Sequence, residues 1–185
     1  METPQAEPIV KTGRRPSPAW IAAGAVAVIV VALLIYGLAA RPATQLVQGN
    51  PVPDFELEAL DGTTINLGAQ LGKVLVLNFF ASWCDPCQRE APALEQAWRE
   101  YKARGVQFYG IAYKDAAPKA QAFLDQFDVS YPSGADPRSE IARSYGVTGV
   151  PETFVIDQQG RLVHRFVGEI TADELTEKLD PLLGP

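Results

Sequence analysis

Two continuous apolar runs separated by a helical pattern constrain the fold of this chain most. The first run, VLVLNFF, covers residues 74–80, and the second, VQFYGIA, covers residues 106–112. Runs of this kind are typical of strands that are covered on both faces of a sheet. Between them, apolar residues recur at helical spacing over residues 86–104, and Gly105 follows where a helix would end. The order strand, helix, strand predicts a right-handed parallel crossover at the centre of an α/β domain.

Shorter elements are expected on either side of this crossover. The segments FELEAL and TTINL, within residues 55–67, are joined through Asp61-Gly62 and predict a β-hairpin. A second antiparallel hairpin is expected over residues 153–167. Further helices are expected over residues 118–127, over residues 139–145, and from Thr171, which opens a capping box.

The N-terminal segment of residues 19–40 is apolar and carries no charged side chain. As a helix it would be about 33 Å long, which matches a bilayer core of about 30 Å. We expect a single-pass, uncleaved anchor in the cell membrane, with a cleaved signal peptide as the alternative. The basic residues before the segment predict a cytoplasmic tail over residues 1–18. A linker over residues 41–51 would then lead to an extracytoplasmic (periplasmic) domain over residues 52–185.

The charge of the chain argues against nucleic acid as a partner. The formal net charge is −6, and the residues after position 40 carry 13 basic against 20 acidic side chains. Lys and Arg are scattered and form no stripe that could neutralise a phosphate backbone. We therefore expect no binding to nucleic acid.

The two cysteines stand two residues apart in Cys84-Asp85-Pro86-Cys87. A zinc site needs further ligands, and the one histidine, His164, is about eighty residues away. A purely structural disulfide would close a loop too short to stabilise the fold much. A redox pair explains more, because the motif follows a buried strand and opens a helix whose dipole would stabilise a thiolate. We expect redox exchange without a metal or another cofactor.

These residues resemble those of the thioredoxin-like proteins. The resemblance rests on Trp83 and the Cys84-Cys87 motif after a buried strand, on Pro92, and on Val150-Pro151 far downstream. It implies a thioredoxin-like α/β fold, in which helices flank a central mixed sheet that carries an N-terminal β-hairpin extension. In this family the helix kinks at the position of Pro92.

The resemblance is closer to one branch of that family. Three features resemble the DsbE/CcmG thiol reductases of cytochrome c maturation: the expected anchor, GVTGVPETFVID at residues 146–157, and GIAYKD at residues 110–115. The ResA and TlpA-type reductases share most of these features. The resemblance extends from about Val52 to Leu183.

The resemblance implies roles for several residues. Cys84 would be the nucleophile, Cys87 the resolving thiol, and Pro151 a cis-proline that packs against the two cysteines. Asn78 stands where thioredoxin carries a buried acid, so another group must accept a proton. Glu90, three residues after Cys87, is the candidate proton relay, and a solvated charge at a helix start is the alternative.

Three further residues are expected to face the substrate. Trp83 and Val150 would form the apolar surroundings of the exposed sulfur, although ordinary packing is an equal alternative. Glu152 follows the predicted cis-proline and ranks above Asp85 as a site residue. His164 is expected at the surface and not in the site.

The acidic surroundings indicate a direction for the chemistry. Carboxylates near Cys84 would raise its thiol pKa and withhold the thiolate stabilisation that makes strong oxidants oxidising. We therefore expect a thiol:disulfide reductase for the Cys-x-x-Cys-His motif of apocytochromes c, with a membrane thiol-electron transporter as its reductant by family resemblance. One alternative is a general extracytoplasmic thiol reductant for other clients, such as copper-site proteins. Another is a redox-inert binding module with the same fold.

Overall fold

The computed structural model describes residues 24, 26–33 and 46–184, and the chain divides into two compact units, residues 1–42 and 43–185. In the first unit, the described residues are helical. Among the described residues, no helix has both the length and the apolar character that a membrane crossing requires. The predicted tail over residues 1–18 and the greater part of the predicted span over residues 19–40 lie outside the described residues.

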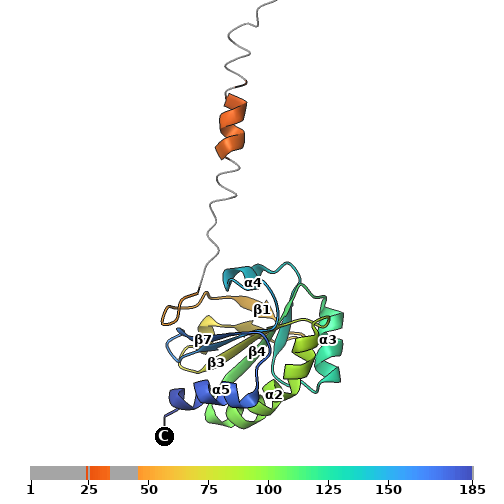
Figure 1. Ribbon diagram of the computed structural model, residues 1–185, viewed down its shortest axis with the longest axis vertical. Coiled ribbons are helices and arrows are strands. Elements are labelled where there is room, and N and C mark those ends of the chain that lie inside the picture. Colours follow the sequence, from red (N-terminus) through yellow and green to blue (C-terminus); the bar gives the residue numbers. More distant parts are fainter. Residues whose placement is uncertain (1–23, 25, 34–45, 185) are drawn as a thin grey trace, which may run out of the picture. The chain divides into compact units, whose positions relative to one another are not determined.

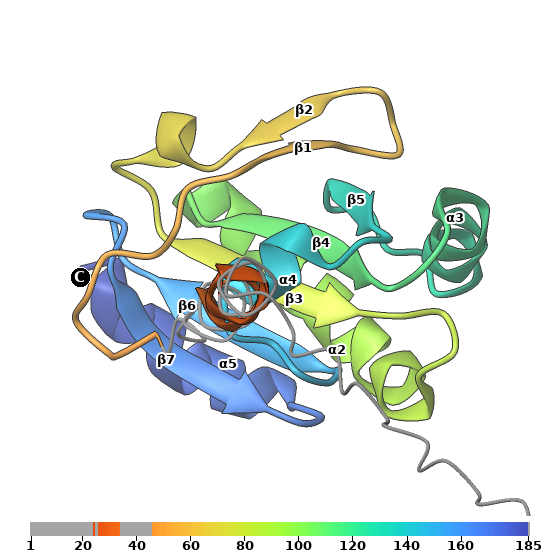
Figure 2. The same cartoon turned by 90° about the horizontal axis from the view of Figure 1, so that it is seen from above.

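A five-stranded mixed sheet in the order β5-β4-β3-β6-β7 forms the centre of the second unit (Figure 2). The central strand β3, Leu75–Phe80, runs parallel to β4, Gln107–Tyr113, and antiparallel to β6, Glu152–Ile156. At the edges, β5, Ser133–Asp136, is parallel to β4, and β7, Leu162–Val167, is antiparallel to β6. The predicted parallel pairing of the two apolar runs and the predicted C-terminal hairpin are confirmed.

The remaining elements lie around this sheet (Figure 1). The N-terminal hairpin consists of β1, Glu56–Glu58, and β2, Thr64–Asn66, and forms a separate two-stranded sheet. The α-helices are α2, Asp85–Tyr101; α3, Ala117–Gln126; α4, Glu140–Ser144; and α5, Ala172–Leu179. Three short 3-10 helices are η1, Gly68–Gln70; η2, Lys102–Arg104; and η3, Asp180–Leu182. The predicted capping box at Thr171 is present.

The two faces of the sheet have separate cores, which explains the unbroken apolar run in β3. Successive side chains of a strand point to opposite faces. Figure 1 shows α4 on one side of the sheet and α2 and α5 on the other. Leu77 and Phe79 pack with the hairpin and α4, whereas Val76 packs with α2 and α5. Asn78 is the polar exception on the α2 face, and it is only 3% exposed.

Strand β5 was not predicted from the sequence. Its residues, Ser-Gly-Ala-Asp, have little intrinsic preference for a strand. The strand is instead specified by its neighbours, because β4 pairs with one edge and Ala59, directly after β1, forms an antiparallel bridge with Gly134. A Cβ atom on Gly134 would lie 2.6 Å from the carbonyl oxygen of Glu58, so only glycine permits this close approach.

The last residues of the predicted linker hydrogen-bond to the domain. The N–H of Gly49 donates to the carbonyl of Leu162 at 2.8 Å, and the N–H of Leu162 donates to the carbonyl of Asn50 at 2.9 Å. The chain therefore enters the domain along β7.

Candidate active site

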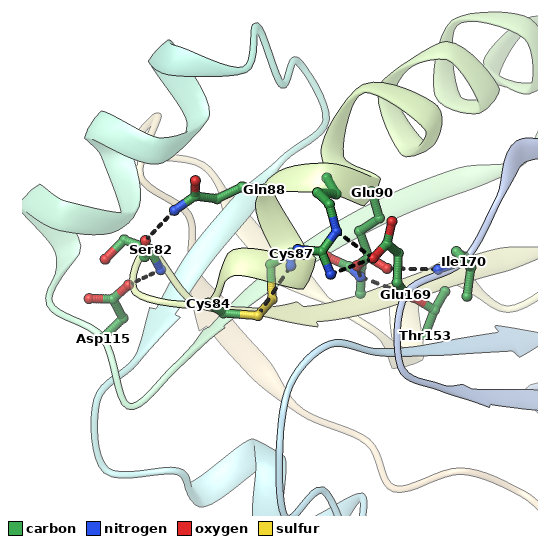
Figure 3. Close-up of a disulfide and its surroundings, with 11 residues drawn as sticks. Ser82, Cys84, Cys87, Gln88, Glu90, Asp115, Thr153, Glu169 and Ile170 are labelled. Carbon is green, nitrogen blue, oxygen red and sulfur yellow. Dashed lines mark hydrogen bonds and ion pairs between the residues drawn. A yellow bond between two sulfur atoms is a disulfide. The ribbon is translucent and has the colours of Figure 1, made fainter.

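The two cysteines form a disulfide at the start of α2, directly after β3 (Figure 3). Cys84 is the N-cap residue, and its Sγ accepts a hydrogen bond from the backbone N–H of Cys87 at 3.2 Å. Pro86 lies in the first turn, where its missing N–H costs no helical bond. Cys84 is 4% exposed and Cys87 is 1% exposed. Because Cys84 is the N-cap residue, a thiolate on it would lie at the positive end of the helix dipole.

A buried carboxylate anchors the turn that leads into the cysteine motif. Asp115, two residues after the end of β4, accepts the backbone N–H of Ser82 at 2.6 Å and that of Ala116 at 2.9 Å (Figure 3). Gln88 donates to the carbonyl of Ser82 at 3.4 Å. Asp115 was not predicted as a site residue, because sequence spacing does not show that the end of β4 lies beside this turn.

Glu90 is buried beside the cysteines and is not a solvated charge. Its carboxyl group is held by donors from two elements: Asn78 Nδ2 donates to Oε1 at 2.8 Å, and the N–H of Ile170 donates to Oε2 at 3.1 Å (Figure 3). Asn78 also donates to Thr153 Oγ1 at 3.0 Å. Because Glu90 is only 2% exposed, the alternative of a water-exposed charge at the helix start is wrong.

The surroundings of Glu90 let it exchange a proton near neutral pH. Burial raises the pKa of the Glu90 carboxyl from 4.5 to about 7. The hydrogen bonds from Asn78 and Ile170 oppose this rise, and the nearby charge of Glu169 adds to it. Burial therefore outweighs the hydrogen bonds, and a group with this pKa can donate and accept protons during thiol exchange.

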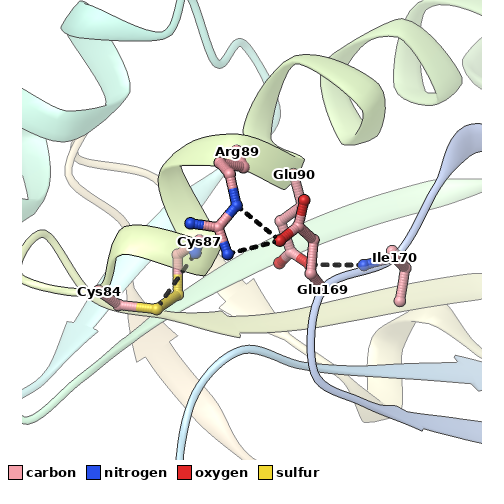
Figure 4. A network of polar contacts seen from close by, with 6 residues as sticks. All are labelled: Cys84, Cys87, Arg89, Glu90, Glu169 and Ile170. Atoms are coloured by element: carbon pink, nitrogen blue, oxygen red, sulfur yellow. Dashed lines mark hydrogen bonds and ion pairs between the residues drawn. A yellow bond between two sulfur atoms is a disulfide. The ribbon is translucent and has the colours of Figure 1, made fainter.

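An ion pair lies beside Glu90 and links α2 to the loop before α5 (Figure 4). Arg89 Nε and Nη2 both approach Glu169 Oε2 at 2.8 Å. Glu169 precedes Ile170, whose N–H binds Glu90. The pair therefore joins the two segments that enclose the Glu90 carboxyl.

The predicted cis-proline follows a residue that packs against the cysteine cluster. The Val150–Pro151 peptide bond is cis, and Val150 packs against the apolar cluster that contains Cys84 and Cys87. A hollow of about 240 Å³ adjoins this peptide bond and is lined by residues from Thr148 to Glu152 and by Val167 and Gly168. Trp83 is 57% exposed and is free to contact a partner.

Glu152 is held inside the protein by an ion pair. It is 2% exposed, and its Oε2 accepts Arg165 Nε at 2.6 Å. Arg165 Nη2 also donates to the carbonyl of Gly146 at 3.0 Å. Glu152 lines the hollow beside the cis-proline, where a client could approach it. Sequence reasoning missed Arg165, because its contacts span two hairpin strands and a loop.

Two other residues considered from the sequence have different surroundings. Asp85 is exposed in the first turn of α2. His164 is half-buried on β7, where its Nδ1 lies 3.2 Å from Gln48 Nε2 and its ring packs against Phe166. The site is thus a disulfide at the start of a helix, with a buried carboxyl group beside it whose pKa is near neutral. This arrangement suits thiol–disulfide exchange.

The domain is similar to known thiol:disulfide exchange proteins. Residues 47–179 match the model of the Redoxin family. The thiol:disulfide interchange protein HelX of Rhodobacter capsulatus is 41% identical over 138 residues, which cover 73% of this chain and 76% of HelX. The thiol-disulfide oxidoreductase ResA of Bacillus thuringiensis is 33% identical over 131 residues, which cover 71% of this chain and 76% of ResA.

A solved structure shares the same architecture. The crystal structure of a candidate thiol:disulfide interchange protein DsbE from Chlorobium tepidum superimposes with a TM-score of 0.70 at 34% identity. The match covers 76% of this chain and 100% of the other.

Proposed function

Because this chain belongs to the Redoxin family and is a thiol:disulfide oxidoreductase of the DsbE, ResA and HelX type, we propose that it reduces disulfides of apocytochromes c outside the cytoplasm. The observation that carries the reductase direction is the buried carboxyl of Glu90 beside Cys84 and Cys87.

The reaction is a two-step thiol–disulfide exchange. The thiolate of Cys84 attacks one sulfur of the client disulfide, forms a mixed disulfide and releases the other client sulfur as a thiolate, which takes up a proton. Cys87 then loses its proton and attacks Cys84 Sγ, which releases the second client thiol and forms the Cys84–Cys87 disulfide. The client gains two electrons and two protons, and this protein loses them. Glu90 is the group proposed to accept the proton of Cys87, since its pKa of about 7 suits that transfer.

The electrostatics of the site favour reduction of the client over its oxidation. A dithiol becomes a strong oxidant in its disulfide form when the reduced form is stabilised as a thiolate. An ionised Glu90 beside the pair opposes the helix dipole and disfavours that thiolate. The disulfide form is therefore relatively favoured, so the dithiol gives up its electrons readily.

The family type and the predicted anchor support the proposed client and electron donor. The segment of residues 146–157, with its Pro151-Glu152-Thr153 sequence, resembles the branch that acts on the Cys-x-x-Cys-His motif. Attachment of c-type haem requires both client thiols to be reduced. The predicted anchor would keep the domain near a membrane thiol-electron transporter, which would reduce Cys84–Cys87 again.

Deletion of the gene tests this function. We expect depletion of holocytochromes c in membranes with normal levels of b-type haem proteins, and recovery when dithiothreitol is added, because a small thiol can replace a reductase. The wild-type gene should restore cytochromes c, and the Cys84→Ala gene should not. An exported domain without residues 1–45 should restore them weakly, because it is no longer tethered. Normal holocytochrome c in the deletion strain, with no second reductase present, would favour a general thiol reductant instead.

A further inference from the structure

Arg165 joins the two ends of the segment that lies against the cysteines. From β7, its guanidinium donates to Glu152 at the end of this segment and to the carbonyl of Gly146 at its start. The Arg165 side chain is 26% exposed and that of Glu152 is 3% exposed, so the pair is largely shielded from water. The guanidinium carbon also lies 5.3 Å from the centre of the Phe154 ring, which supports its orientation.

Between these two ends, Val147 is buried and its N–H donates to the carbonyl of Ala142 at 2.8 Å, but the next three residues have fewer restraints. Within the described residues, no backbone hydrogen bond involves Thr148, Gly149 or Val150. The N–H of Gly168 donates to the carbonyl of Pro151 at 2.9 Å, which restrains the far end. The position of Val150 against the cysteine cluster therefore depends on how the ends are held.

We propose that Arg165 is a positioning residue for client binding. By holding Gly146 and Glu152 together, it keeps Val150 against the cysteine cluster, and the cis-proline that follows it, in the arrangement that receives the client. Lysine cannot replace it fully, because one ammonium group lacks the planar fork that reaches two acceptors at once. Arg165 touches no reacting atom, so its loss should weaken client binding more than the exchange step itself.

The test uses single-turnover reduction of an oxidised peptide by the pre-reduced full-length protein. Peptides that contain Cys-Ala-Ala-Cys-His or Cys-Ala-Ala-Cys-Ala are added in excess, and oxidation of the protein is followed by tryptophan fluorescence, since Trp83 adjoins Cys84. The dependence of rate on peptide concentration separates the half-saturating concentration from the limiting rate. This inference rests on the proposed reductase activity. Equal rates of the wild-type protein with the two peptides would argue against a cytochrome client, but the comparison between protein variants would still hold.

Four variants distinguish positioning from simple loss of structure. Arg165→Met should raise the half-saturating concentration about tenfold and lower the limiting rate less than about twofold, and Arg165→Lys should be intermediate. Arg165→Met alone leaves the buried Glu152 without its partner, which is destabilising. The double variant Glu152→Gln with Arg165→Met removes that charge, so its thermal midpoint should recover while its half-saturating concentration stays high. Arg138→Met removes a separate, exposed ion pair with Glu140 and is the matched control.

Two results would overturn the proposal. The first is a lower limiting rate at an unchanged half-saturating concentration, because that is the sign of fewer folded molecules. The second is a return of the double variant to the wild-type half-saturating concentration, because the effect would then come from the unpaired charge of Glu152 and not from the lost contact with Gly146.

Discussion

The carboxamide of Asn78 donates to Oε1 of Glu90 across 2.8 Å, in the interior between β3 and α2. The strand thus supplies a neutral donor, and the helix supplies the titratable carboxyl. The same carboxamide donates to Thr153 on the neighbouring strand β6, which is its direct partner in the sheet register. Two strands therefore hold the orientation of the amide, and the amide holds the carboxyl beside the cysteines.

Glu90→Gln should change how stability depends on pH. Folded Glu90 keeps its proton up to a pKa of about 7, whereas the unfolded chain releases it near 4.5. The stability contributed by this raised pKa is complete below pH 4.5 and is lost as pH rises to 7. This difference in pKa corresponds to a loss of roughly 3 kcal/mol in the free energy of unfolding. Guanidinium unfolding of the disulfide form from acid to neutral pH should show this fall in the wild type and not in the variant.

The control for this experiment is Glu100→Gln, an exposed acid on the same helix. The stability of the Glu100→Gln variant should decrease as pH rises, as it does in the wild type. A fall of wild-type size in Glu90→Gln would assign the dependence to another group.

Glu169→Gln should shift the same stability fall to lower pH. The charge of Glu169 raises the pKa of Glu90, so its removal should lower that pKa. Arg89 would remain beside Glu90 without its partner and should act in the same direction. The midpoint of the stability change should move by a fraction of a pH unit, since both members of the pair are partly exposed to water. Glu177→Gln removes an exposed pair on α5 and should leave the midpoint in place. An upward shift in Glu169→Gln would contradict this account.

The parts of the fold that depend on local pattern could be predicted from the sequence. The apolar runs in β3 and β4 and the helical spacing in α2 are visible within single segments. The capping box at Thr171 and the Asp61-Gly62 turn are likewise short-range signals. The cysteine pair could be recognised because its spacing and its place at a helix start both have a chemical reason.

The parts that depend on distant contacts could not be predicted in the same way. Strand β5 exists because β4 and the N-terminal hairpin enclose it, and its own residues do not favour a strand. The sequence suggested Glu90 as a proton relay by resemblance, but its two donors come from β3 and from the loop before α5. Arg165 gave no signal, because its acceptors on Glu152 and Gly146 lie on other elements.

The reduction potential of the Cys84–Cys87 pair should be nearer to the thioredoxin value of about −270 mV than to the strong-oxidant value of about −120 mV. Glu90→Gln should raise the potential and lower the pKa of the Cys84 thiol, because it removes a negative charge near the thiolate. The effect should be larger at pH 8 than at pH 6, because the wild-type carboxyl is ionised only above its pKa of about 7. Equilibration in defined thiol buffers, followed by alkylation and gel separation, gives both potentials. A wild-type value above roughly −180 mV would be inconsistent with a reductase.

Client trapping should work with only one of the two cysteine variants. In Cys87→Ser, the mixed disulfide formed at Cys84 lacks its resolving thiol and should accumulate, as seen by non-reducing electrophoresis and mass spectrometry. In Cys84→Ser, the remaining Cys87 lies within α2, three residues past the N-cap position of Cys84, so it should trap little. The variant without either cysteine controls for non-covalent association. Equal trapping by the two single variants would mean that the roles of nucleophile and resolving thiol are assigned incorrectly, because both sulfurs would then be open to attack on a client.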